Sequence, residues 1–113
     1  MPATIIILTD KNFDHHFAQA KLLAIDFWAP WCEPCKDFSR IFQEAAVEFP
    51  TVQFATVNVD EEKNLAQDFS VKSVPTFAII RNQVMVFHQA GTQPKKALID
   101  LLKQAVALPD IQF

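Results

Sequence analysis

The chain of 113 residues contains one glycine, no tyrosine and only two cysteines. A dinucleotide-binding loop needs three glycines at fixed spacing, so the single Gly91 excludes that fingerprint and we expect no bound cofactor. No apolar run approaches the ~18 residues that a membrane-spanning helix requires. A formal net charge of −3, without a long basic run, argues against nucleic acid as the main partner.

The length predicts one domain over residues 1–113, because most domains contain ~100–150 residues. Eleven phenylalanines predict a Phe-rich core. The first four residues lack the charged and apolar segments of a signal peptide. With two cysteines and no export signal, we expect a reducing cytoplasm, where a disulfide is transient and catalytic rather than structural.

The hydrophobic pattern predicts an α/β chain with the element order βαβαβαββα. We expect strands near residues 5–8, 22–28, 54–59, 76–80 and 84–88, with Asp10 and Asp60 capping the first and third helices. The second helix should follow the cysteines and end at Pro50. Crossover helices predict parallel neighbours and the late hairpin predicts antiparallel ones, which gives a mixed sheet with helices on both faces.

The two cysteines stand together in Trp31-Cys32-Glu33-Pro34-Cys35-Lys36. Pro34 is favoured in the first turn of a helix. If that helix begins near Cys32, its unpaired N–H groups and its dipole favour the Cys32 thiolate, as does nearby Lys36. Cys35, one turn further along, should be more buried and less ionised. The motif therefore predicts that Cys32 attacks a disulfide and Cys35 resolves the product.

A Cys-x-x-Cys pair is also half of a tetrahedral zinc site. Completing such a site takes two more ligands, and the remaining candidates are His15, His16 and His88. We expect all three histidines at the surface, and therefore no metal.

The segment from Asp26 to Lys36 resembles the active-site segment of the thioredoxin family, and Val74-Pro75-Thr76 is similar to that family's cis-proline loop. The resemblance covers nearly all of the chain and implies a thioredoxin fold. It implies a reversible disulfide between Cys32 and Cys35, a buried Asp26 that exchanges a proton with Cys35, and a cis Pro75. It also implies a substrate-contacting surface made of Trp31, Glu33, Pro34, Val74, Pro75, Ala90 and Gly91.

Two of these roles have simpler alternatives: Asp26 as a structural carboxylate held by backbone donors, and Pro75 as an ordinary trans proline at a strand start. Three positions also depart from the family pattern. Glu33 replaces the usual glycine between the cysteines, Thr56 stands where a lysine is common, and Arg40 stands where a helix-kinking proline is frequent.

The resemblance implies a protein-disulfide reductase that acts through a mixed disulfide. Its partners would be disulfide-containing proteins and a thioredoxin reductase that supplies electrons from NADPH, and we expect a monomer. Two alternatives stay open: a dedicated electron donor or binding subunit for one partner, and a disulfide oxidase or isomerase.

Overall fold

The computed structural model describes residues 4–109, and within them it has the predicted element order. The strands are β1 (Ile5–Ile7), β2 (Leu22–Trp28), β3 (Gln53–Asn58), β4 (Thr76–Arg81) and β5 (Val84–Ala90). The helices are α1 (Phe13–Gln19), α2 (Glu33–Glu48), α3 (Lys63–Asp68) and α4 (Lys95–Ala107). No helix in this part of the chain is both long enough and apolar enough to cross a bilayer.

The strands form a mixed sheet in the order β1-β3-β2-β4-β5. β3 pairs in parallel with both β1 and β2, because helices connect these strands, whereas β4 pairs antiparallel with β2 and β5. The central strand β2 is buried from Leu22 to Phe27, as its nearly unbroken apolar run predicts. Asp26 interrupts that run deep inside the molecule.

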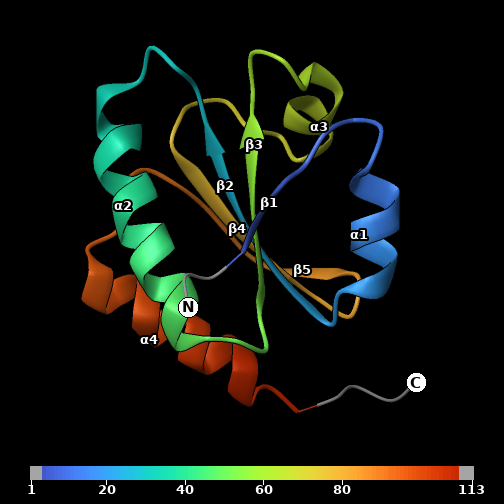
Figure 1. The fold of residues 1–113 in the computed structure, drawn as a ribbon, viewed down its shortest axis with the longest axis vertical. Helices are drawn as coiled ribbons and strands as arrows, with labels where there is room; N and C mark the ends of the chain where they lie inside the picture. Colours follow the sequence, from blue (N-terminus) through green and yellow to red (C-terminus); the bar gives the residue numbers. More distant parts are fainter. Residues whose placement is uncertain (1–3, 110–113) are drawn as a thin grey trace.

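Helices cover both faces of the sheet: α2 and α4 lie on one face, and α1 and α3 lie on the other (Figure 1). The α2/α4 face is rich in phenylalanine, as the composition predicts. Phe42 is fully buried there and contacts three other rings, those of Phe38, Phe54 and Phe77. The other face packs aliphatic side chains around Phe27, and the partly buried rings of Phe13, Phe17 and Phe69 pack against them. Packing of α2 against its face of the sheet fixes where the first turn of the helix lies relative to the ends of the strands.

The two predicted helix caps are wrong. Asn12 precedes α1 and Glu62 precedes α3, and neither side chain caps its helix. Asp10 instead accepts a hydrogen bond from the Leu65 N–H in the first turn of α3, at 3.0 Å. Asp60 accepts one from the Trp31 indole. Both carboxylates therefore join segments that are distant in sequence.

The predicted hairpin between β4 and β5 is confirmed. Asn82 and Gln83 both adopt the left-handed region, with φ of 50° and 67°, which matches the twist of a two-residue hairpin loop. β5 forms one edge of the sheet, and its apolar side chains Val84, Met85 and Val86 are exposed.

Candidate active site

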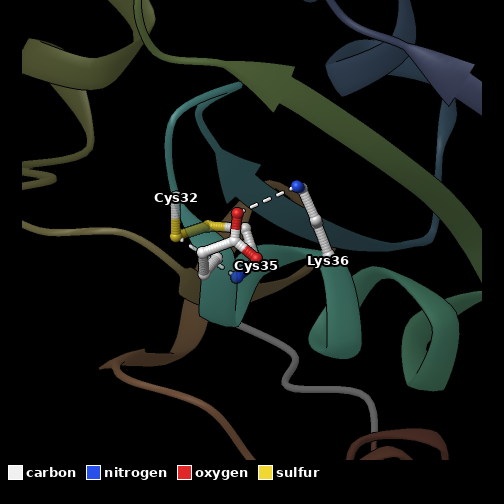
Figure 2. A network of polar contacts seen from close by, with 4 residues as sticks. Cys32, Cys35 and Lys36 are labelled. Carbon is white, nitrogen blue, oxygen red and sulfur yellow. Dashed lines mark hydrogen bonds and ion pairs between the residues drawn. A yellow bond between two sulfur atoms is a disulfide. The ribbon is translucent and has the colours of Figure 1, made fainter.

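The dithiol lies at the first turn of α2. Cys32 is the N-cap residue, with extended backbone, and its Sγ accepts a hydrogen bond from the Cys35 N–H at 3.2 Å. The two cysteines form a disulfide, with their Cα atoms 5.3 Å apart (Figure 2). Pro34 occupies the first turn, where its missing N–H costs nothing. The helix thus begins at Glu33, directly after Cys32, and this meets the condition under which the sequence analysis expects its N–H groups to favour the Cys32 thiolate.

A charged pair lies beside the disulfide. The Lys36 ammonium is 3.0 Å from a carboxylate oxygen of Glu33, and both side chains are largely exposed (Figure 2). In water such a pair contributes at most about 1 kcal/mol. Lys36 is therefore partly neutralised by Glu33, and the N–H groups of the helix are left as the main stabiliser of a thiolate at Cys32.

The two sulfur-bearing residues differ little in burial. Cys32 is 4% exposed and Cys35 is 2% exposed, so the predicted contrast between them is small. The residue before Cys32 is much more exposed than either cysteine. Trp31 is 69% exposed, and its indole N–H donates to Asp60 Oδ2 at 3.0 Å. Trp28, in comparison, is partly buried and packs against the cysteine pair. Trp31 thus offers a fixed aromatic surface immediately before Cys32.

Asp26 lies on the sheet face that α2 covers. It is fully buried, and neither carboxylate oxygen has a hydrogen-bond partner among the described residues. Burial disfavours the charged form and raises the pKa of Asp26 from 3.8 to about 7. The alternative of a carboxylate satisfied by backbone donors is therefore not what the structure has. Asp26 can gain or lose a proton near neutral pH.

The proline loop packs against the dithiol. The Val74–Pro75 peptide bond is cis, which confirms the prediction. Val74 contacts the cluster formed by Ala29 and the two cysteines. The Gly91 N–H donates to the Pro75 carbonyl at 2.8 Å, so the loop that follows β5 is held beside the proline loop. Gly91 has φ of 100°, which glycine adopts at little cost.

The histidines do not gather near the cysteines. His15 and His16 are neighbours on α1, and His88 on β5 bonds the Phe69 carbonyl through Nε2 at 2.8 Å. Over residues 4–109 there is no group of three or more side chains that could hold a metal ion. Sequence reasoning missed the contact of His88 with Phe69, because it joins two segments that no local pattern connects.

A disulfide at a helix N-terminus, facing a proline loop on this sheet, defines the class of thiol–disulfide oxidoreductases. Comparisons with known proteins agree. The family model described as Thioredoxin matches residues 4–104, and the chain belongs to the thioredoxin family, whose members are protein-disulfide reductases.

Individual relatives match over most of their length. The chain is 41% identical to a thioredoxin of Mycoplasma genitalium, over 80% of this chain and 89% of the relative. It is 33% identical to a thioredoxin of Haemophilus influenzae, over 90% and 97% respectively. A crystal structure of Malassezia sympodialis thioredoxin superposes with a TM-score of 0.84 at 29% identity, covering 95% of this chain and 96% of that one. These likenesses confirm the predicted fold.

Proposed function

We propose that this oxidoreductase reduces disulfides of client proteins with Cys32 as the attacking thiolate and Cys35 as the resolving thiol. The observation that carries this assignment is the position of Cys32 at the N-cap of α2, where its sulfur accepts the Cys35 N–H. A sulfur in that position is stabilised as a thiolate by the helix N-terminus. The exposed Trp31 and the neighbouring Pro75 loop supply an apolar surface on which an extended client segment can dock.

Asp26 serves as the proton acceptor for Cys35 in this proposal. Its buried carboxyl, without a protein hydrogen bond and with a pKa of about 7, holds or releases a proton at little cost near neutral pH. Ionised Asp26 takes the proton from the Cys35 thiol, and the Cys35 thiolate attacks Cys32 in the mixed disulfide. The Cys32–Cys35 bond forms, the bond to the client breaks, and the client thiolate takes a proton from water.

The electrons come from outside the chain. We propose NADPH as their source, delivered through a flavin-containing thioredoxin reductase, because the single glycine leaves no dinucleotide fingerprint here. A reducing cytoplasm suits this cycle. Both cysteines belong to the reactive pair, so the protein needs no structural disulfide. We further propose that it acts as a monomer.

Insulin reduction driven by dithiothreitol tests the reductase. We expect the intact protein to accelerate precipitation of the insulin B chain and the Cys32→Ser variant to be inactive. The Cys35→Ser variant should instead accumulate a stable mixed disulfide, since the resolving thiol is missing. A Cys32→Ser variant that retained the activity would overturn the assignment of the nucleophile.

The second candidate function is that of a dedicated electron donor for one partner. The exposed Glu33 beside the dithiol favours it, because a negative charge there discriminates among client surfaces. Trapping with Cys35→Ser from a cell extract separates the two. Many captured clients indicate a general reductase, whereas a single captured protein indicates a dedicated donor. An equilibrium potential with glutathione of around −120 to −180 mV would instead indicate an oxidase or isomerase.

A further inference from the structure

The proline loop is the end of a segment that joins α3 to β4. This connecting segment covers residues 69–75, from the C-cap residue of α3 to Pro75. Its downstream end is held beside β5, because the Gly91 N–H donates to the Pro75 carbonyl at 2.8 Å. Just before that point, Val74 packs against the cysteine pair. The way in which the connecting segment is held therefore sets the position of two residues that are expected to contact a client.

A histidine of β5 holds the upstream end of the connecting segment. His88 Nε2 lies 2.8 Å from the carbonyl oxygen of Phe69. A carbonyl only accepts hydrogen bonds, so the bonded ring nitrogen is the one that carries a hydrogen. Phe69 is the C-cap residue of α3, and the carbonyls at the end of a helix have no partner within it. His88 therefore supplies a donor that the helix itself lacks.

The hydrogen bond from His88 fixes the direction in which the chain leaves α3. The Phe69 ring is already anchored, because it packs against the rings of Phe13 and Phe27. The Phe69 carbonyl, in contrast, belongs to the planar peptide group that joins Phe69 to Ser70, so holding it restricts ψ of the first residue and φ of the second. Ser70 has φ of 54°, a left-handed conformation that is unfavourable for a residue with a side chain. His88 therefore stabilises the turn at which the connecting segment begins.

The middle of the connecting segment depends on its two ends. Backbone hydrogen bonds from Ser70 and Val71 to carbonyls of α3 hold the turn, but the described residues 72–74 donate none from a backbone N–H. The two anchors on the β5 side, His88 and Gly91, are three residues apart, which corresponds to about 10 Å along a strand. Six residues of extended chain can span about 20 Å. The connecting segment is thus longer than the gap that it bridges, and its anchors limit the conformations that it adopts.

We propose that His88 is a positioning residue for client binding: its hydrogen bond to the Phe69 carbonyl holds the connecting segment in the conformation in which Val74 and Pro75 receive a client. This inference rests on the proposed docking of clients beside the Pro75 loop. Without the bond the connecting segment samples further conformations, and the apparent affinity for a client falls with the fraction of molecules that are ready to bind. The dithiol at the start of α2 lies outside these contacts, so the reactivity of Cys32 itself is unchanged.

The test compares two disulfides in single turnovers of the reduced protein. For a peptide with an internal disulfide, His88→Leu should lower the second-order rate constant about three- to tenfold, the range expected for the loss of one hydrogen bond to a neutral carbonyl. Hydroxyethyl disulfide has no backbone to dock, so its rate constant should stay within about twofold of the parent value. His88→Gln should restore the peptide rate, because its amide N–H extends as far as Nε2. His88→Asn is one bond shorter and should behave like His88→Leu.

His15→Leu is the matched control, because it removes another exposed histidine, on α1, whose described hydrogen bond is to Gln19; it should leave both rate constants unchanged. Equal peptide rates in His88→Leu and the parent would overturn the proposal. So would an equal loss of rate with hydroxyethyl disulfide, or a His88→Gln variant that restores nothing. Failure of the proposed function is seen in the parent alone, which would then reduce the peptide no faster than Cys32→Ser does.

Discussion

Replacing Asp26 by asparagine should stabilise the oxidised protein, and the gain should depend on pH. Asparagine has nearly the same shape and no charge, and Asp26 makes no described hydrogen bond that the change would remove. Burial raises the pKa of Asp26 from 3.8 to about 7. At ~1.36 kcal/mol per pKa unit, this shift means that ionised Asp26 costs the folded state about 4 kcal/mol.

The sign of this pH dependence follows from the pKa of Asp26 in the unfolded chain and in the folded protein. In the unfolded chain the carboxyl ionises near pH 4, and in the folded protein it ionises near pH 7. Between these values the folded state binds the extra proton, so the free energy of unfolding falls as pH rises, by up to ~1.36 kcal/mol per pH unit. Below pH 4 Asp26 carries no penalty, and above pH 7 it carries all of it.

Urea unfolding of the oxidised protein measures this effect, because the joined cysteines do not titrate. We expect Asp26→Asn to raise the free energy of unfolding by about 4 kcal/mol at pH 8.5, but by only about 1 kcal/mol at pH 4.5. Asp68→Asn, at an exposed position on α3, is the control and should change it by less than about 0.5 kcal/mol at both pH values. An Asp26→Asn gain of the same size at both pH values would refute the argument from burial.

Three further substitutions test other parts of the structure. Phe42→Ala should lower the free energy of unfolding by about 3–5 kcal/mol, because the ring is fully buried among three others; a urea midpoint near that of the parent would contradict this. Gly91→Ala should cost about 1 kcal/mol in the same assay, through its φ of 100° alone, since no atom lies within 4 Å of the added Cβ; no change would show that the backbone there relaxes freely. Glu33→Gln should speed iodoacetamide alkylation of reduced Cys32 about two- to fourfold at pH 7, since it removes a negative charge roughly 7 Å from the sulfur. Lys36→Gln should slow the same reaction, and identical rates in all three proteins would show that the ion pair has no influence on Cys32.

Structural features that depend on residues close together in the sequence were predictable from the sequence. The start of α2 follows from Pro34 and the adjacent cysteines, and its Sγ to N–H contact spans only three residues. The Asp26 burial follows from its place within an apolar strand. Such features are set within one element, so a short stretch of sequence contains the information that determines them.

The two misplaced caps show where this reasoning fails. Asp10 and Asp60 have the residue type that caps helices, yet each bonds a partner 55 or 29 positions away. A carboxylate accepts whichever N–H group the tertiary fold brings near it, and local propensity carries no information about that. The row from Ile7 through Thr56 to Asp26 could not be predicted for the same reason, because it exists only once β1, β3 and β2 are in register.

The placement of the two tryptophans makes the protein its own optical probe. The chain has no tyrosine, so its near-ultraviolet emission comes from Trp28, packed on the cysteine pair, and from Trp31, the residue before Cys32. Opening or closing the sulfur–sulfur bond changes the surroundings of the Trp28 indole, which packs against it. Each stage of a turnover can therefore be followed in stopped flow without attaching a dye.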